Sequence, residues 1–375
     1  MTRTYIDVHV VQTVPPSNLN RDDTGSPKTA FFGGVRRARV SSQAWKRATR
    51  TAFQDVLDLS LLGVRTRRVV ELVAEEIRRQ NRDVGEEDAI TAAEGVLGKA
   101  GIKLKPARKK EAPQESGYLL FLSRRQVQNL AAAALVAHDG GQYPVNVKQL
   151  ADTEHSVDLA LFGRMVADTR DLDVDAAVQV AHAISVHAVE EQFDYFTAVD
   201  DHKAADEEED AGAAMIGTVE FNSSTLYRYA TIDVVRLAEN LGDSAAVRAA
   251  VEAFVGCFVT SMPTGKQNTF ANRTLPDAVL VQVRDDQPVN YVGAFEESIV
   301  SPSGRVSRAV DRLAEHARDL DQAYGLQAVE SFAAGPKARP LGEVRPWADV
   351  VTAVGDVVAS RLQATTVAEP APVPA

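Results

Sequence analysis

The sequence has almost no cysteine and no long apolar run. Cys257 is the single cysteine among 375 residues, so the chain forms no intramolecular disulfide and no thiolate metal site. No stretch of about 18 uninterrupted apolar residues is present, and the opening MTRTYIDVHVVQ lacks the basic flank and apolar core of a signal peptide. We therefore expect a cytoplasmic protein that does not span a membrane.

Common catalytic motifs are missing as well. The histidines show no HExxH or other metal-ligand spacing, and no serine stands in a GxSxG context. Cys257 lies in the apolar segment VGCFVTS, which is typical of a buried, inert thiol. Gly265 and Lys266 lack the GxxxxGK[ST] spacing of a nucleotide-binding loop. They indicate instead a loop that makes contacts through its backbone. We expect no catalytic residue, no metal site and no cofactor.

Charge is distributed unevenly along the chain. The formal net charge is −11, yet residues 1–50 carry nine Lys or Arg against three Asp, a net charge of +6. Residues 190–220 carry eleven acidic side chains against Lys203 alone, a net charge of −10. An acidic average argues against a generally nucleic-acid-binding surface, but a basic segment inside an acidic chain predicts a confined site for a polyanion.

Hydrophobic periodicity predicts an α+β protein. Residues 4–12 alternate like a half-buried strand, and strand patterns return at 225–234 and 278–284 around a helix near 244–260. The region 59–182 is mainly helical. Helices are predicted near 64–80, 86–100, 124–137, 156–168, 173–189, 304–323 and 345–362. This order indicates one discontinuous domain with a large helical insertion, and we expect the Pro/Ala-rich tail 368–375 to be disordered.

The segment Leu19 to Arg50 has the composition of a phosphate site. It combines basic side chains, hydroxyls, an amide and glycines, which together neutralise and hydrogen-bond an anion. Ser41 or Ser42 is predicted to cap a helix over residues 44–53, on which Lys46 and Arg50 lie one turn apart. A capped helix with a solvated basic face is the alternative. Residues 99–110 form a second basic segment, expected to be a mobile loop.

The acidic region 194–220 allows two kinds of function. The first is phosphodiester cleavage at a divalent metal held by Asp200 and Asp201 beside His202, because oxygen ligands suit magnesium; a plain solvated loop is the alternative. The neighbouring apolar side chains either stack on bases from a protruding hairpin or anchor that hairpin to the core. These side chains are Phe193, Tyr195, Phe196 and Val199.

Five motifs together resemble the CasC family, the repeated backbone subunit of the type I-E CRISPR Cascade complex. They are SNLNRDD (17–23), AFFGGVRRARVSSQAWKRATR (30–50), FTAVDD (196–201), GTVEFNSSTLYRYATI (217–232) and GKQNTFANRTLPD (265–277), in family order. The resemblance spans residue 5 to about 295. It implies a modified RRM-like, ferredoxin-like palm with a helical finger insertion and a thumb hairpin. The implied palm is 1–58, 183–190 and 221–375, the fingers are 59–182 and the thumb is 191–220.

The resemblance also implies a function. The chain would be a non-catalytic scaffold that grips the guide RNA (crRNA) backbone, polymerises along the spacer and displaces one base at regular intervals. The implied RNA contacts are Arg21, Lys28, Ser41, Gln43, Lys46, Arg50, Met165, Phe196, Thr197, Val199, Lys266 and Gln267. Met165, in the motif FGRM, would be an apolar wedge; its alternative is a helix core residue.

The implied partners are copies of the chain, other Cascade subunits, target DNA within the complex and a recruited nuclease-helicase. The acidic run Asp206 to Asp210 departs from the family pattern, and we expect it to face a neighbouring subunit or solvent, because it would repel RNA. The basic segment 99–110 would contact target DNA or a neighbour. Related type III subunits cut RNA with an aspartate, which keeps Asp200 and Asp201 as the endonuclease alternative. A protein-interaction subunit without RNA would leave the charge of residues 1–50 unexplained.

Overall fold

A large antiparallel sheet forms the centre of the molecule. The computed structural model describes residues 3–166, 170–198, 215–301 and 303–367. The strand order in the sheet is β13-β12-β1-β11-β9-β3-β2, and β8 and β10 also pair with β11. The strands are β1 (Tyr5–Ser17), β2 (Thr29–Phe32), β3 (Val35–Val40), β8 (Val178–Val180), β9 (Ala183–Ser185), β10 (Gln192–Ala198), β11 (Met215–Asp233), β12 (Ala278–Arg284) and β13 (Glu330–Ala334).

Helices cover both faces of this sheet. On one face lie α1 (Ser42–Ala52), α8 (Val234–Leu241), α9 (Ser244–Thr260) and α12 (Trp347–Val367). On the other face lie α11 (Arg305–Tyr324) and the 3-10 turn η4 (Tyr291–Phe295). Short elements in the connections are η1 (Phe53–Asp55), η2 (Leu59–Leu61), α10 (Gln267–Phe270) and η5 (Arg339–Leu341). We call this sheet with its helices the sheet body.

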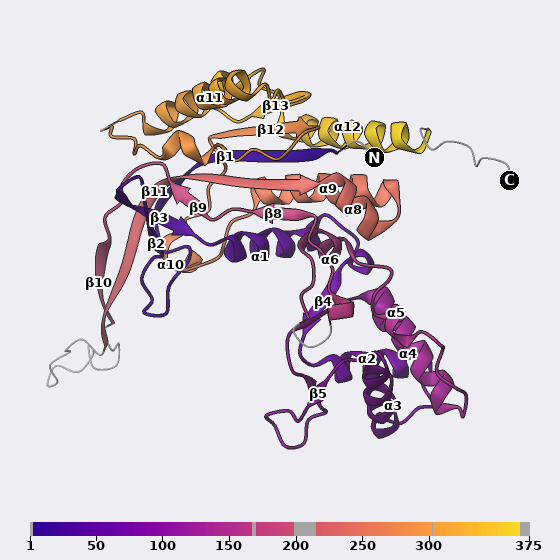
Figure 1. The fold of residues 1–375 in the computed structure, drawn as a ribbon. Coiled ribbons are helices and arrows are strands. Elements are labelled where there is room, and N and C mark those ends of the chain that lie inside the picture. Colours follow the sequence, from indigo (N-terminus) through magenta and orange to yellow (C-terminus); the bar gives the residue numbers. More distant parts are fainter. Residues whose placement is uncertain (1–2, 167–169, 199–214, 302, 368–375) are drawn as a thin grey trace, which may run out of the picture.

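A helical insertion and a long hairpin extend from the same side of the sheet body (Figure 1). The insertion, residues 63–172, has its own apolar core, with Val73, Ile77 and Leu130 at its centre. It contains β4 (Gly63–Thr66), α2 (Val69–Gln80), α3 (Glu86–Lys99), β5 (Leu104–Lys105), β6 (Glu115–Ser116), β7 (Leu120–Ser123), α4 (Arg124–His138), α5 (Val147–Leu150), α6 (Val157–Phe162) and η3 (Arg170–Leu172). The hairpin consists of β10 and the first residues of β11.

The first strand is buried on both faces, so the half-buried prediction was wrong. Ile6, Val8 and Val10 belong to the core under α9 and α12, as predicted for one face. The opposite face carries Asp7 and His9, which are also buried, because α11 and η4 cover it. Polar residues on that face are tolerated since they have partners: Asp7 is paired with Arg284 and accepts a hydrogen bond from the Tyr229 hydroxyl.

Most of the predicted helices are present. The predictions near 86–100, 124–137, 244–260, 304–323 and 345–362 correspond to α3, α4, α9, α11 and α12. The helix predicted over 173–189 is wrong, because β8 and β9 occupy this segment and pair with the 19-residue strand β11. The helix predicted over 156–168 ends at Phe162, and the one over 64–80 is preceded by strand β4. No described helix has the length and apolar character needed to cross a bilayer.

Candidate nucleic-acid interface

The loop of residues 18–28 is fastened to the start of α1 and to the base of the hairpin. Asn20 accepts the Ser41 amide N–H at its Oδ1 (2.9 Å), and its carbonyl accepts the Lys28 N–H (2.9 Å). The Asn18 side-chain amide donates to the Glu220 carbonyl of β11 (3.0 Å). The loop therefore holds Arg21, which is exposed, and Lys28, which is half-buried, beside the N-terminus of α1.

Asp22 shapes the tip of this loop. Its Oδ1 accepts hydrogen bonds from the Thr24 N–H (2.9 Å), the Thr24 hydroxyl (2.7 Å) and the Ser26 N–H (3.0 Å). The Thr24 hydroxyl and these backbone donors lower the pKa of Asp22. A lowered pKa means that the loop gains stability above the ordinary carboxyl pKa of about 3.9 and loses it as pH falls through the lowered value.

We expect Asp22→Ala to loosen the loop at neutral pH. The amides of Thr24 and Ser26 lose their acceptor, so their hydrogen exchange should become severalfold faster. Asp23, the exposed neighbour of Asp22, provides the matched control. Asp23→Ala should leave both exchange rates unchanged. Equal rates in Asp22→Ala and the natural chain would show that the carboxylate does not order the loop.

The segment Gly265 to Phe270 lies against the same loop. A Cβ placed on Gly265 would come within 2.3 Å of the Leu19 carbonyl oxygen, so only glycine allows this approach. At the other end of the segment, the Phe270 ring packs on Phe221 of β11 with a centroid distance of 5.7 Å. Lys266 is half-buried at the N-terminus of α10, and Gln267 is exposed. Two segments far apart in sequence are thus in contact, and Arg21 and Gly265 line one pocket between them.

Gly265→Ala should separate these two segments. The added Cβ meets backbone, which cannot rotate away, so we expect the free energy of unfolding to fall by about 1–3 kcal/mol. Gly256→Ala is the control, because nothing lies within 4 Å of a Cβ added in the middle of α9. Urea unfolding of both variants measures the difference. An unchanged free energy of unfolding in Gly265→Ala would show that the two segments move apart without loss of stability.

Helix α1 presents a polar face beside the two loops. Ser41 caps the helix and is buried, with its hydroxyl accepting from the Ala44 N–H. Trp45 is buried against the sheet body, whereas Gln43 and Arg47 are exposed. Burial lowers the pKa of Lys46. Within the described ranges Lys46 has no carboxylate partner, so its ammonium group is available to an anion.

Three arginines of the basic segment already have internal partners. Arg37 is fully buried and donates to the carbonyls of Phe32, Ser185, Phe295 and Glu296. Arg36 pairs with Glu191, and Arg50 pairs with Asp158. The basic surface is therefore smaller than the net charge of residues 1–50 indicated, because a sequence count does not separate cations in the core from those in solvent.

Arg50 joins α1 to the helical insertion. Its Nε donates to Asp158 Oδ2 of α6 (2.8 Å) and its Nη2 to the Gly63 carbonyl (3.1 Å). Asp158 Oδ1 in turn accepts the Gly63 N–H (2.9 Å). The guanidinium also lies over the Phe121 ring, 4.5 Å from its centroid. These contacts give Arg50 a structural role, and its contact with RNA stays a prediction.

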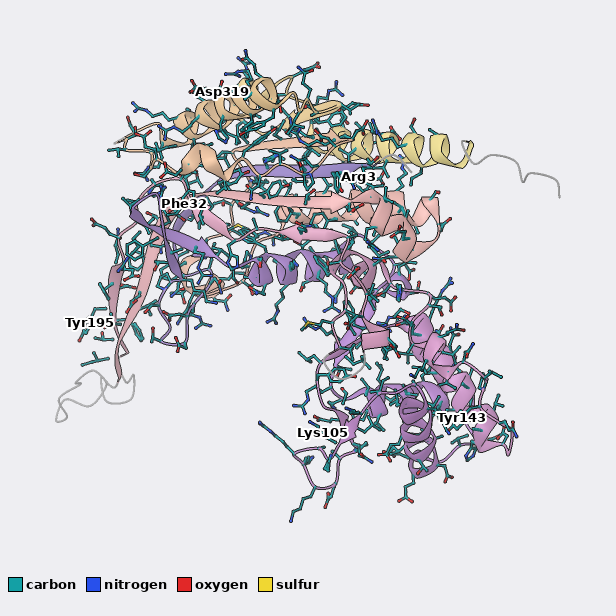
Figure 2. All side chains as sticks on the ribbon, viewed as in Figure 1. Arg3, Phe32, Lys105, Tyr143, Tyr195 and Asp319 are labelled. Atoms are coloured by element: carbon teal, nitrogen blue, oxygen red, sulfur yellow. The ribbon has the colours of Figure 1, made fainter. Side chains whose placement is uncertain are left out.

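The hairpin carries apolar side chains on both faces. Phe193 and Tyr195 are 65% and 63% exposed, so they do not anchor the hairpin to the core; Figure 2 shows Tyr195 well away from the sheet body. Phe196 faces the other way and is 38% exposed, because its ring packs over Gly217, its partner in β11. Thr197 is exposed.

Several predicted residues lie outside the described part of the chain. They are Val199, Asp200, Asp201, the acidic run 206–210 and the tail 368–375. In the described part, no group of three or more His, Cys, Asp or Glu side chains is placed to hold a metal ion. Met165 is described and is 85% exposed, so its interpretation as a helix core residue was wrong.

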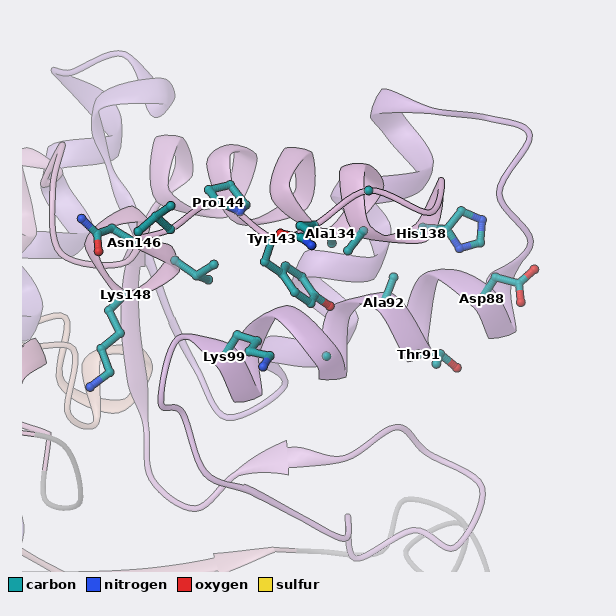
Figure 3. A pocket seen from close by; sticks show the side chains of 16 residues that line it. Asp88, Thr91, Ala92, Lys99, Ala134, His138, Tyr143, Pro144, Asn146 and Lys148 are labelled. Atoms are coloured by element: carbon teal, nitrogen blue, oxygen red, sulfur yellow. The ribbon is translucent and has the colours of Figure 1, made fainter.

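The insertion carries two features apart from these residues. The segment 99–110 is partly ordered as a hairpin, because β5 pairs with β6, and Lys105 lies far from the sheet body (Figure 2). A hollow between α3, α4 and the loop before α5 is lined by Lys99, His138 and Tyr143 among others (Figure 3). None of the predicted RNA contacts lines this hollow.

Sequence reasoning missed Arg39. It lines a small pocket with Lys28 and Asn222, and its Nη1 lies 3.1 Å from the His182 ring. In the motif RRARV nothing distinguishes this half-exposed arginine from its buried neighbour Arg37, since both occupy the same phase of β3. The tertiary environment alone separates the two.

Comparisons with known proteins agree with the architecture. The profile of the CT1975-like protein family matches residues 6–350. The chain is similar to a solved chain described as "CRISPR RNA-guided surveillance complex, pre-nicking", with 34% identity and a TM-score of 0.85 over 94% of this chain and 100% of that one. It is also similar to a chain of a "CRISPR RNA-guided surveillance complex", with 30% identity and a TM-score of 0.74 over 94% and 99%. No curated protein matches. The chain therefore belongs to the CT1975-like protein family, and the resemblance to Cascade backbone subunits is confirmed.

Proposed function

We propose that the chain is a non-catalytic scaffold that binds the backbone of a guide RNA in a type I-E CRISPR surveillance complex and assembles in several copies along it. In this proposal the sheet body is an RRM-like palm, the helical insertion is the fingers and the hairpin is the thumb. Relatives with at least 30% identity over 94% of the chain belong to RNA-guided surveillance complexes. Copies of the chain, other subunits and target DNA are the proposed partners.

One observation carries this proposal. Three segments, one of them more than 200 residues from the other two, gather on the side of the sheet body from which the insertion and the hairpin extend (Figure 1). They are the loop 18–28, helix α1 and the segment 265–270, and they bring cations, amides and hydroxyls together. Arg21, Lys28, Lys46 and Lys266 supply charge, while Gln43 and Gln267 supply hydrogen bonds. This chemistry holds phosphates without reading bases.

Apolar side chains flank this basic face. Phe196 lies on the hairpin beside the polar Thr197, and Met165 lies between Phe162, which packs on the sheet body, and Val166, which belongs to the core of the insertion. An apolar side chain that enters a strand of stacked bases separates them, and stacking on an aromatic ring holds the displaced base. We propose that these residues displace guide bases at intervals, whereas Ser41 acts through its cap on α1.

The test is co-purification of the chain with its complex partners, followed by extraction and sizing of bound nucleic acid. A uniform short RNA is expected. An RNA-free complex would overturn the proposal and favour a protein-interaction subunit. Incubation of the same complex with magnesium tests the endonuclease alternative, and the scaffold function requires that the bound RNA stays intact. Cleavage that is lost in Asp200→Ala and Asp201→Ala would establish the nuclease instead.

A further inference from the structure

Met165 is an exposed apolar side chain between two buried neighbours. It is 85% exposed, whereas Arg164 and Val166 are 5% and 2% exposed. The segment follows the end of α6 at Phe162, whose ring packs on Phe53 and Phe254 in the sheet body. Val166, in contrast, belongs to the core of the insertion. The chain therefore crosses from one core to the other at the point where Met165 projects.

Arg164 is held in three directions. Its Nε donates to the Leu172 carbonyl (2.6 Å), its Nη1 to the Phe121 carbonyl (3.1 Å) and its Nη2 to Asp152 Oδ1 (3.0 Å). These acceptors lie on η3, on β7 and just after α5, so one planar guanidinium connects three parts of the insertion. A buried cation with this many partners fixes the position of its own backbone.

The backbone on either side is fixed as well. Arg164 and Val174 exchange both backbone hydrogen bonds, at 2.9 and 2.8 Å, and the Val166 N–H donates to Asp173 Oδ1 (2.5 Å). Gly163 adopts a φ of +73°, and a Cβ there would lie 2.6 Å from the Val174 carbonyl oxygen. Strain and contact both exclude other residues at this position.

We propose that Arg164 is a positioning residue that holds Met165 as a preformed apolar wedge against a base of the bound single-stranded RNA. The inference rests on the proposed function. Methionine has a flexible side chain, and ordering it costs conformational entropy. A rigid backbone restricts the positions that the thioether can occupy before RNA binds. Less conformational entropy is then lost when the side chain inserts between bases. Arg164 contributes without touching RNA.

The experiment uses the full chain bound to single-stranded RNA that carries 2-aminopurine at one position at a time. Unstacking raises the fluorescence of this base, so displaced positions appear as bright ones. Met165→Ala removes the wedge without disturbing a core, because the side chain is exposed. Arg164→Gln removes the guanidinium, and Asp173→Ala releases the Val166 N–H from an exposed side chain. Arg125→Gln, which breaks an exposed pair with Glu154 in the same insertion, is the control.

The expected result separates positioning from general stability. Met165→Ala, Arg164→Gln and Asp173→Ala should each lower the fluorescence at the wedge positions by about twofold or more. RNA affinity should change by less than about twofold, because phosphate contacts dominate it. Arg125→Gln should match the natural chain. If Arg164→Gln does not fold, Asp152→Ala decides the question, because it removes the carboxylate partner of the Arg164 guanidinium and should lower the fluorescence at the same positions.

Each contrary result has a distinct meaning. Full fluorescence in Arg164→Gln and Asp173→Ala, with loss in Met165→Ala, would overturn the positioning role of Arg164. Full fluorescence in Met165→Ala would overturn the wedge itself. Equal loss of fluorescence at all bright positions, including those displaced by the hairpin, would show that Arg164 only stabilises the fold. Absence of RNA binding by the natural chain would instead refute the proposed function.

Discussion

The double variant Lys46→Ala, Lys266→Ala is expected to bind single-stranded RNA about tenfold more weakly at physiological salt. The two ammonium groups lie on separate segments, α1 and the start of α10, which share one side of the sheet body. Each contact with a phosphate releases counterions from the RNA. Loss of two contacts should therefore reduce the slope of log affinity against log salt by about 1.4, or about 0.7 for each phosphate.

A control with the same change in charge distinguishes a local site from a net-charge effect. Arg318 is exposed on α11, which covers the opposite face of the sheet, and Lys337 is exposed just after the edge strand β13. Arg318→Ala, Lys337→Ala should keep both the affinity and the salt slope. Fluorescence anisotropy titrations at several salt concentrations measure these quantities. Equal losses in the two double variants would show that net charge, and not the proposed interface, drives binding.

Arg50→Ala is expected to lower the free energy of unfolding of the RNA-free chain by about 3 kcal/mol. The side chain of Asp158 is only 2% exposed, so removal of Arg50 leaves a buried carboxylate with one remaining N–H donor, that of Gly63. The variant also loses the contact of the guanidinium with the Phe121 ring. The loss of stability arises mainly because the buried Asp158 carboxylate loses its charged partner.

Urea unfolding of the RNA-free chain measures this cost without any contribution from RNA. Arg47→Ala is the matched control, because Arg47 is an exposed neighbour on the same helix, and its effect should stay within about 0.5 kcal/mol. An Arg50→Ala variant with unchanged stability but weaker RNA binding would show that Arg50 serves RNA, as the family resemblance implied. A loss of both stability and salt slope would assign it both roles.

Local sequence patterns were sufficient to predict many of the helices and strands. The strand predicted at 278–284 has the bounds of β12, and the helix predicted near 244–260 is α9. In both segments the apolar residues of the predicted pattern are buried in the core, so the local pattern and the tertiary environment agree. The segment 173–189 misled the prediction because its short apolar stretches fit a helix or a strand equally well, and pairing with β11 decided between them.

The sequence by itself determined the family, the α+β class and the residue types that suit phosphate, because these follow from local order and composition. Only the tertiary structure decided which cations reach solvent. Arg37, Arg39 and Arg50 look alike in sequence, yet one is buried among carbonyls, one lines a pocket and one pairs with Asp158. Burial and charge pairing depend on residues more than a hundred positions away, such as Ser185 and Phe295 for Arg37. No local pattern carries that information, because it arises when distant segments pack together.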